Sequence, residues 1–454
     1  MIAPLHPGFR PPILEYRAQQ RAVAAAGGGE LLAVALERQG GLVARAEARV
    51  LPGEHPGFAA GAAFWERWLR FFVWSRGAAR IFLAGEPRLC DHLRAAYALG
   101  GARSFDRDLL ARVFGKRLEV EIVELEEMPA AKESRSPLGG HFDGCRIGFD
   151  LGASDYKLAA VIEGRAVFSD ELPWDPKSEP DPGYHLGHIE AALKKAASRL
   201  PRVDAIGGSA AGIYIDNRVK VASLFRAVPA EVFASTVEPM FVRLGERWGV
   251  PLTVINDGDV TALAGSLSLD VHGILGIAMG SSQAAGYLDA EGHVMGWLNE
   301  LGFAPVDLSP KAPVEEWSGA LGAGTSYFSQ RAVDRLARAA GIERDPAAGL
   351  PERLEAVQAR VDQGDPAAEQ VFETVGVHLG YTIPWYRLFY DFAHLLILGR
   401  VTSGRAGEIV ASTARRLLEE EFPDVASRLT LHLPDEKSRR VGQAVAAASL
   451  PELG

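Results

Sequence analysis

Residues 148–157 read Gly-Phe-Asp-Leu-Gly-Ala-Ser-Asp-Tyr-Lys. An apolar strand leads into Asp150, a glycine follows at position 152, and the chain then returns as a second strand. Gly152 lets the backbone approach a ligand closely, and the hydroxyl of Ser154 adds a donor beside the backbone N–H groups. Such a turn suits nucleotide phosphates, with Asp150 placed to hold Mg²⁺ through water. A plain β-hairpin is the alternative.

A second motif joins the end of a strand to an alanine-rich helix, and it reads Val254-Ile-Asn-Asp-Gly-Asp-Val-Thr-Ala-Leu-Ala264. Asn256 and Asp257 follow the strand at its carboxyl end, where ligands bind in open α/β sheets. An aspartate there can accept the proton of a substrate hydroxyl that attacks a γ-phosphate. The alternative is that either side chain only caps the helix.

Two later loops repeat the pattern of an apolar strand followed by a turn. The first is a loop of small residues that includes Gly280 and Ser281. The second follows the apolar stretch His394–Leu398 and runs from Gly399 to Gly404. A second phosphate loop and a turn that packs against adenosine are the functional interpretations. An ordinary hairpin and a structural βα junction are the alternatives.

The four motifs occur in the order used by the actin-like ATPases, and residues 145–450 resemble the ROK group of sugar kinases in that superfamily. Further segments match motifs of the group. They are 205–216 (a strand, a small-residue loop and “xVD”), 254–264 (“NDANAAALAE”), 296–303 (“GEIGH”), 322–329 (“GCLEAYAS”) and the closing helix at 441–448.

The resemblance implies an α/β protein with the two-lobed actin-like ATPase (RNase H-like) fold and an extra N-terminal α/β domain. The first kinase lobe is expected at 143–272 with the C-terminal helix 437–449, and the second at 273–436. A Pro- and Gly-rich linker at 128–143 separates them from the N-terminal domain, residues 1–130.

The resemblance also implies an ATP- and Mg²⁺-dependent phosphotransferase that acts on a sugar hydroxyl. Asp257 would be the catalytic base, and Asn256 and Glu300 would bind the sugar. A non-catalytic sugar or nucleotide sensor and an ATPase acting on a larger substrate docked by the N-terminal domain are the alternatives. The residues that would bind the nucleotide and its metal are Asp150, Gly152, Ser154, Lys157, Gly280, Ser281, Gly399 and Gly404.

The chain departs from the family at two places. Phe303 stands where the family has a metal-binding His, and the cysteines of its CxCGxxGC motif are absent, so no zinc is expected. The second phosphate loop of the family reads GTGxGxG. Here Met279 and a Ser-Ser-Gln-Ala-Ala run stand in that loop, and Arg400 replaces a usual glycine in the last one.

The first 130 residues have no counterpart in the plain kinases. Leu31–Leu36 and Leu42–Val50 read as two strands around a Gly-Gly turn, and Phe64–Trp74 reads as an aromatic-rich helix. Further strand and helix patterns follow, which indicates an α/β domain rather than a helix-turn-helix. We expect a degenerate actin-like lobe used for packing or for homodimer formation.

The length, charge and cysteine content of the chain argue against several classes of protein. A chain of 454 residues with 48% hydrophobic residues must form more than one domain. Its formal net charge of −10 argues against a nucleic-acid partner. The two cysteines, Cys90 and Cys145, lie far apart in the sequence and form no CxxC pair, so no disulfide framework is expected. No signal peptide and no bilayer-spanning run is visible, which predicts a cytoplasmic protein without a membrane partner.

Overall fold

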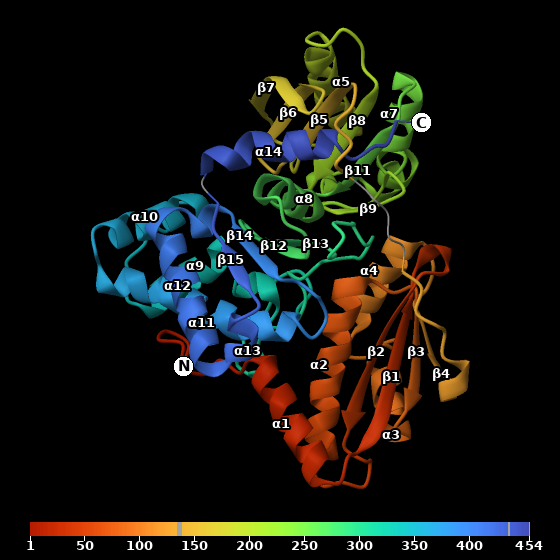
Figure 1. Ribbon diagram of the computed structural model, residues 1–454, viewed down its shortest axis with the longest axis vertical. Coiled ribbons are helices and arrows are strands. Elements are labelled where there is room, and N and C mark those ends of the chain that lie inside the picture. Colours follow the sequence, from red (N-terminus) through yellow and green to blue (C-terminus); the bar gives the residue numbers. More distant parts are fainter. Residues whose placement is uncertain (134–138, 435, 454) are drawn as a thin grey trace. The chain divides into compact units, whose positions relative to one another are not determined.

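The computed structural model describes residues 1–133, 139–434 and 436–453. The chain forms two compact units, which Figure 1 shows coloured along the sequence. Unit 1 comprises Met1–Ser134, Ile277–Ala285 and Gly296–Leu433, and unit 2 comprises Arg135–Gly276, Gly286–Met295 and Pro434–Gly454. Residues 134–138 of the predicted linker lie outside the described residues.

Unit 2 is built on a five-stranded mixed sheet with the order β11-β8-β5-β6-β7. The central strand β5 pairs antiparallel with β6 and parallel with β8, and β8 pairs parallel with β11. Every residue of β5 is buried, because helices cover both faces of the sheet. The strands are β5 (Cys145–Leu151), β6 (Asp155–Ile162), β7 (Arg165–Pro173), β8 (Ala205–Ala210) and β11 (Leu252–Asn256).

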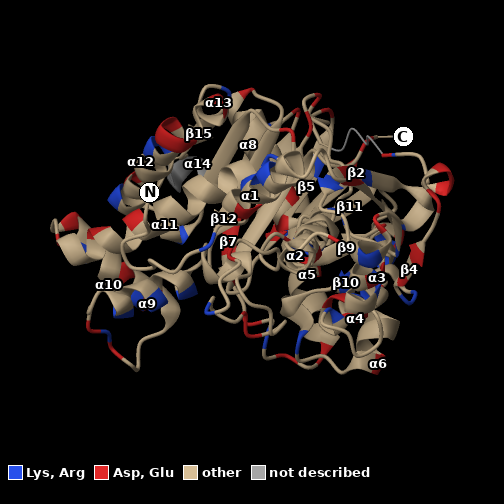
Figure 2. Ribbon diagram, turned by 90° about the horizontal axis from the view of Figure 1, so that it is seen from below, with Lys and Arg blue, Asp and Glu red and all other residues tan. Residues whose placement is uncertain are grey.

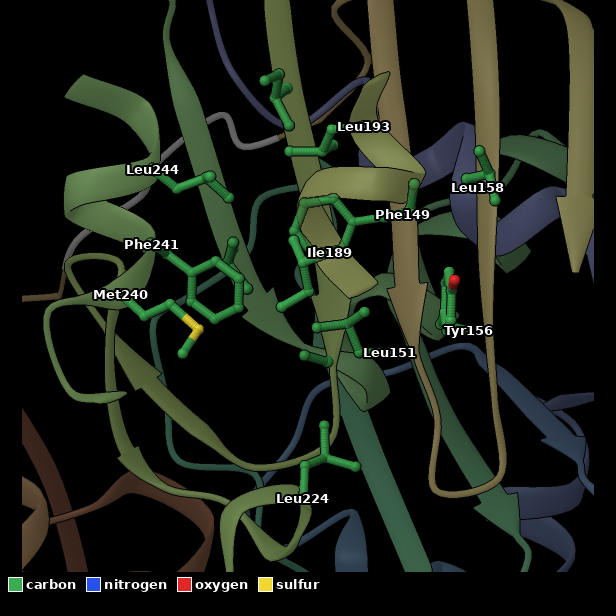
Figure 3. Close-up of a cluster of buried hydrophobic side chains, with 14 of the residues drawn as sticks. Phe149, Leu151, Tyr156, Leu158, Ile189, Leu193, Leu224, Met240, Phe241 and Leu244 are labelled. Carbon is green, nitrogen blue, oxygen red and sulfur yellow. The ribbon is translucent and has the colours of Figure 1, made fainter. Parts of the chain in front are cut away.

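One face of this sheet packs against α5 (Pro182–Ala197) and α7 (Met240–Trp248). Figure 3 shows the resulting core, in which Phe149 from β5 faces Ile189 of α5 and Phe241 of α7. The rings of Phe149 and Phe241 are stacked with their centroids 6.0 Å apart. This apolar core fixes the position of β5, which carries the first sequence motif.

The other face is covered by α14 (Glu436–Ala448), which lies across the sheet in Figure 1. The approach is close enough to require glycine in the strands. A Cβ atom on Gly148 would lie 1.7 Å from the carbonyl oxygen of Ala444, and one on Gly207 would lie 1.6 Å from that of Ala447. These glycines therefore let helix and sheet backbones touch, and the alanine-rich sequence of α14 matches that contact.

The apolar periodicity of residues 230–248 predicts one long helix, and the structure contradicts that prediction. The structure has α6 (Ala230–Val232), a π-helical turn over Phe233–Val237 and then α7. Pro239 stands immediately before α7, and its missing N–H group prevents a continuous α-helix through this point. A small hairpin, β9 (Ile213–Ile215) with β10 (Arg218–Val221), follows β8 and was not predicted.

A second four-stranded sheet, with the strand order β13-β12-β14-β15 and helices beside it, belongs mostly to unit 1, while residues 274–276 of β12 and 286–288 of β13 belong to unit 2. The longest of these helices, α11 and α12, pack together where glycines of α11 meet α12: a Cβ on Gly376 would lie 2.7 Å from that of Thr413. The elements are β12 (Ile274–Met279), β13 (Gln283–Leu288), α9 (Gln330–Ala339), α10 (Leu350–Asp362), α11 (Pro366–Tyr386), β14 (His394–Leu398), α12 (Gly404–Glu421), α13 (Pro423–Ala426) and β15 (Thr430–His432).

The rest of unit 1 is the N-terminal α/β domain, whose sheet has the order β2-β1-β3-β4. The predicted hairpin of β1 and β2 is confirmed, with Gly40 and Gly41 at positive φ in its turn. The elements are α1 (Pro12–Ala25), β1 (Glu30–Glu37), β2 (Val43–Val50), α2 (Phe58–Arg76), β3 (Arg80–Gly85), α3 (Pro87–Ala96), α4 (Ser104–Phe114) and β4 (Glu119–Ile122).

The connectivity of this N-terminal sheet differs from that of unit 2. Strand β3, which follows the helix α2, pairs antiparallel with β1, whereas β8 in unit 2 pairs parallel with β5. The two sheets therefore differ in the pairing of the strand that follows their first covering helix, and the degenerate actin-like lobe expected for residues 1–130 stays a prediction. Helix α2 of this domain packs by aromatic contacts on the rest of unit 1, for example Phe71 on Phe389 at 4.3 Å and on Trp385 at 5.2 Å.

Some charged side chains are buried as pairs, such as Arg70 of α2, which bonds both carboxylate oxygens of Asp106 in α4 at 2.7 and 3.1 Å. Acidic and basic residues are interspersed along the elements in Figure 2. Asp334 of α9, for example, pairs with Arg338, Arg344 and Arg353 at 3.0–3.4 Å. Among the helices of the described residues, none combines the length and apolarity needed to cross a bilayer.

Because α14 and the sheet are in such close contact, we expect that adding a single methyl group between them lowers the free energy of unfolding markedly. Gly207→Ala should destabilise unit 2 by about 3 kcal/mol, because the new methyl group would overlap a helix carbonyl. The matched control is Gly187→Ala in α5, where a Cβ atom meets nothing within 4 Å. That change should stabilise the helix by about 0.5–1 kcal/mol. Urea unfolding of both variants measures the difference, and equal stabilities would contradict the packing described for α14.

Candidate functional site

Four polar residues gather at the carboxyl ends of parallel strands in unit 2. The register places Asp150 of β5 opposite Ser209 of β8, and Ser209 opposite Ile255 of β11. The Ser209 hydroxyl donates a hydrogen bond of 2.6 Å to Oδ1 of Asp150. Both side chains are buried. Asn256 and Asp257 come next along β11, so the two predicted carboxylates, Asp150 and Asp257, lie at the same edge of the sheet.

A lysine neutralises part of this acidic edge. Lys157 lies opposite Asp150 in the β5–β6 register, and its Nζ is 3.4 Å from Oδ2 of Asp150 and 3.3 Å from Oδ1 of Asp155. Burial disfavours the ammonium group, but the two carboxylates outweigh this effect and raise the pKa of Lys157. A permanently charged lysine beside a glycine turn is suited to an anionic ligand such as a phosphate.

The β5–β6 turn itself has a defined shape. The N–H of Gly152 donates to the carbonyl of Asp155 at 3.0 Å, and a Cβ on Gly152 would lie 2.9 Å from that oxygen. Trp174 holds the other side, because its indole Nε1 donates to the Gly152 carbonyl at 2.9 Å. Ser154 is exposed, and its hydroxyl donates to Asp155 at 3.0 Å. The turn is therefore prearranged with a small, polar, exposed tip.

Asn256 is the N-cap of α8 (Asp257–Leu269). Its Oδ1 accepts from the N–H of Gly258 at 2.7 Å, and its Nδ2 donates to the carbonyl of Gly212 at 2.7 Å. The capping interpretation of this residue is therefore confirmed. The same two bonds orient the side chain rigidly and tether the turn after β8 to the start of α8.

Asp257 is the first residue of α8 and carries an unusual pKa. Burial and then the negative charge of Asp150 raise its pKa to about 6, while the N–H groups of Gly258 and Asp257 favour the charged form. Tyr214 of β9 adjoins it, and burial together with the charge of Asp257 raises the pKa of that phenol. A carboxyl group that titrates near neutrality at a strand end is well suited to general-base chemistry.

Ser209 and Tyr214 were not predicted as site residues from the sequence. Ser209 had a weak signal, because it is a single hydroxyl in the small-residue strand Ala205–Ala210, whose end pairs with the motif that carries Asp150. Tyr214 had none, because its proximity to Asp257 arises from the unpredicted hairpin of β9 and β10.

The other predicted nucleotide residues lie in unit 1, around the β12–β13 turn. Gly280 begins this turn, and its carbonyl accepts from the N–H of Gln330 at the start of α9, at 2.9 Å. Gly399 has φ 102°, and a Cβ there would lie 2.4 Å from the carbonyl oxygen of Met279. Gly399 thus packs against the strand before the turn, whereas Gly404, with φ 59°, is the first residue of α12.

The bulky residues of the β12–β13 loop are directed into the protein. Met279 is fully buried, and Gln283 is 4% exposed, with its amide donating to the hydroxyl of Tyr386 at 3.2 Å. Ser281 and Ser282 form the exposed part of the loop. The loop therefore presents only small side chains to solvent, although it lacks most of the glycines of the family motif.

Glu300, the last predicted sugar ligand, is partly buried in unit 1. Its N–H donates to the carbonyl of Trp74 in α2 at 3.1 Å. Phe303, which stands at the position of the family's metal-binding His, packs on Trp74 with ring centroids 4.8 Å apart.

One group of possible metal ligands, Asp289, Glu291 and His293, was found among the described residues. Asp289 there accepts the N–H groups of Glu291 and His293, at 3.0 and 2.8 Å, and so holds a turn.

No protein-family model matches this sequence, and no curated protein is significantly similar to it. Solved structures do match the fold. A ROK family glucokinase from Streptomyces griseus, in complex with glucose and AMPPNP, has a TM-score of 0.52 at 20% identity, over 68% of this chain and 100% of that chain.

Two further solved structures are similar to this chain in fold. A ROK family transcriptional regulator, a homologue of the E. coli MLC protein, has a TM-score of 0.53 at 19% identity and covers 68% of this chain and 78% of its own. A ROK hexokinase from Thermus thermophilus has a TM-score of 0.51 at 19% identity, over 67% of this chain and 97% of its own. The chain therefore has the actin-like ATPase fold of ROK sugar kinases and regulators, as the sequence predicted.

The raised pKa of Asp257 predicts a pH-dependent cost in stability. Its pKa is raised from an ordinary 3.8 to about 6, so stability is lost as the pH rises through this interval and the carboxyl ionises. Asp257→Asn cannot ionise. The variant should match the wild type at pH 4 and exceed it by about 2 kcal/mol at pH 8.

Urea unfolding of both proteins at pH 4 and pH 8 measures this difference in stability, and hydrogen exchange of the β5 and β8 amides reports it at the site. The control is Asp270→Asn at the exposed, left-handed C-cap of the same helix, a position that asparagine also tolerates. A constant difference between Asp257→Asn and the wild type at both pH values would show that Asp257 ionises normally.

Proposed function

We propose that this protein transfers the γ-phosphoryl group of ATP to a hydroxyl group of a small sugar. The observation that carries the proposal is the edge of the unit 2 sheet, where Asp257 has a pKa of about 6 beside Asp150 and Ser209. The fold shared with ROK sugar kinases supports it. ATP as the phosphoryl donor places the reaction in the cytoplasm.

Asp257 is the general base in this proposal. With a pKa of about 6, most of its carboxyl groups are ionised at pH 7 yet still basic enough to take a proton. The carboxylate accepts the hydroxyl proton as the sugar oxygen bonds to the γ-phosphorus, and the bond from that phosphorus to ADP breaks. Burial of the carboxylate, which raises its pKa, also keeps it poorly hydrated and therefore reactive.

The residues around Asp150 fit a Mg²⁺–ATP complex. Carboxylate and hydroxyl oxygens are the ligands that Mg²⁺ prefers, and it usually retains several waters. Asp150 keeps unused lone pairs beyond its bonds to Ser209 and Lys157, so it would hold the ion through water. When bound, the ion neutralises charge on the phosphates. Lys157 adds a fixed positive charge, and the turn at Gly152 and Ser154 supplies backbone and hydroxyl donors.

The remaining roles in this proposal come from the sequence resemblance. Asn256 would orient the sugar, with the amide hydrogen and the lone pair that remain after its bonds to Gly212 and Gly258. Glu300 would bind a sugar hydroxyl. In unit 1, Gly280 and Ser281 would contact the phosphates, and the region from Gly399 to Gly404 would contact the nucleoside.

A non-catalytic sensor is the second candidate. Two observations favour it: a ROK transcriptional regulator shares the fold, and the β12–β13 loop lacks most glycines of the family motif. Release of ADP upon addition of hexoses separates the two candidates. Sugar-dependent ADP release supports the kinase, and sugar binding without ADP release supports the sensor.

The proposed base leads to a specific kinetic prediction. Asp257→Asn should reduce kcat by about 10²-fold or more, because the hydroxyl proton loses its acceptor. In the wild type, kcat/KM for the sugar should fall as the pH drops below about 6, where Asp257 becomes protonated. A coupled ADP-release assay over pH 5–9 with a hexose panel measures both effects.

Asp270→Asn at the far end of α8 is the matched control and should retain wild-type kinetics. If Asp257→Asn keeps full activity, or if kcat/KM does not change between pH 5 and 7, Asp257 is not the base.

Nucleotide binding should depend on the β5–β6 turn. Gly152→Val should remove measurable ATP binding, because its side chain would meet the Asp155 carbonyl and reshape the turn. Calorimetry with ATP and Mg²⁺ compares this variant with Gly187→Ala, which lies in α5. Unchanged ATP affinity in Gly152→Val, with the fold intact by circular dichroism, would place the phosphates elsewhere.

A further inference from the structure

Helix α2 of the N-terminal domain ends against the segment that carries Glu300. The last four carbonyls of an α-helix have no partner within the helix. In α2 the first of these, that of Val73, accepts from Gly77 at 2.7 Å. The other three accept from one short segment: Leu298 donates to Arg76 at 3.2 Å, Asn299 to Ser75 at 3.1 Å and Glu300 to Trp74 at 3.1 Å.

A stacked arginine reinforces this junction. The guanidinium carbon of Arg76 lies 3.4 Å from the ring centroid of Trp297 and 4.7 Å from that of Tyr390. The same guanidinium donates to the carbonyl of Phe389. Arg76 is the last residue of α2, where a positive charge also interacts favourably with the helix dipole. Its side chain therefore joins the end of α2 to the start of the Glu300 segment.

Two further bonds hold the segment from the side. The indole Nε1 of Trp297 donates to Glu133 at 3.1 Å, and Glu133 also pairs with the buried Arg38, which follows β1. Asn299 is buried in the left-handed region, at φ 51°, and its Oδ1 accepts from the hydroxyl of Tyr390 at 3.0 Å. Asparagine adopts this conformation more readily than most non-glycine residues, and the bond from Tyr390 fixes its side chain there.

The segment is also held beyond Glu300. The N–H of Phe303 donates to the Glu300 carbonyl at 3.1 Å. The ring of Phe303 packs on Trp74 of α2 and on Trp317, with centroids 4.8 and 5.3 Å away. The backbone of Glu300 is thus bonded through its N–H to α2 and through its carbonyl to a residue that packs on α2.

We infer that the carboxyl end of α2 is a positioning element for Glu300, so that the N-terminal domain is part of the sugar-binding apparatus. This inference rests on the proposed function, in which Glu300 binds the sugar. The physical reason is preorganisation. A segment that is ordered before the sugar arrives loses less conformational freedom on binding, and the affinity for the sugar rises accordingly.

Arg76→Ala tests the inference, with Arg17→Ala as its matched control. Arg17 of α1 also stacks on an aromatic ring of unit 1, that of Phe422 at 4.0 Å. The hydrogen bonds that hold residues 298–300 come from α2 and not from α1. In Arg76→Ala the amides of residues 298–300 should exchange with solvent at least tenfold faster. The sugar KM should rise about tenfold, with kcat and the KM for ATP unchanged. Arg17→Ala should alter neither readout.

A double-mutant cycle separates positioning from general support of the fold. Glu300→Gln should weaken sugar binding by itself, and Arg76→Ala should then add little in the Glu300→Gln background, because Arg76 acts through Glu300. If Arg76→Ala does not fold, Trp297→Phe is the second variant: it removes the hydrogen bond to Glu133 and reduces the aromatic surface under the Arg76 guanidinium, while a smaller ring remains. It should raise the sugar KM in the same direction.

The outcomes are distinguishable from failure of the proposed function. Amides 298–300 that stay equally protected in Arg76→Ala overturn the inference, as do additive effects of Arg76→Ala and Glu300→Gln or an equal effect of Arg17→Ala. A wild-type protein that neither binds nor phosphorylates any hexose overturns the proposed function and the sugar-binding part of the inference. Hydrogen exchange at the three amides still decides whether α2 orders the segment.

Discussion

The candidate site depends on backbone contact between α14 and strands β5 and β8. At Gly148 and Gly207 the helix carbonyls come so close that no side chain fits between them. This contact fixes the two strands that deliver Asp150 and Ser209, and the Phe149 core fixes β5 from the opposite face (Figure 3). Two residues from the C-terminal part of the chain, Ala444 and Ala447, thus help to place a site that is coded near residue 150.

The site concentrates charge in a way that costs stability. Asp150 and Asp257 lie close enough for the charge of one to raise the pKa of the other, and one lysine, Lys157, is held against Asp150. A protein selected for stability alone would not place two carboxylates together in a partly buried position. By contrast, a phosphate ligand that carries a cation uses all three groups: the cation interacts with the two carboxylates, and the phosphate interacts with the lysine. The unfavourable electrostatics of the free protein therefore favour a ligand-binding role for this edge.

Much of the architecture could be predicted because it follows from local patterns. The fully apolar run of β5 and the Gly-containing turn after it were recognisable, and so was the change from strand to helix at Asp257. The helix predicted over 230–248 was broken instead, because apolar periodicity continues past Pro239 while the hydrogen-bond pattern cannot. In the site, Asp150 and Asp257 were found from the sequence, but Ser209 was not, since only strand pairing brings it to Asp150.

The residue patterns alone determined that this is an α/β chain with one aspartate near the end of an apolar strand and another just after a second strand, because strand and turn propensities act over a few neighbouring residues. Tertiary structure decided how those residues behave. The pKa of Asp257 depends on burial and on Asp150, more than one hundred positions away. The role of the N-terminal domain depends on backbone groups at Trp74 and Glu300, which bond to each other whatever their side chains are. Backbone hydrogen bonds between distant segments leave no mark in the sequence, so only the folded chain reveals them.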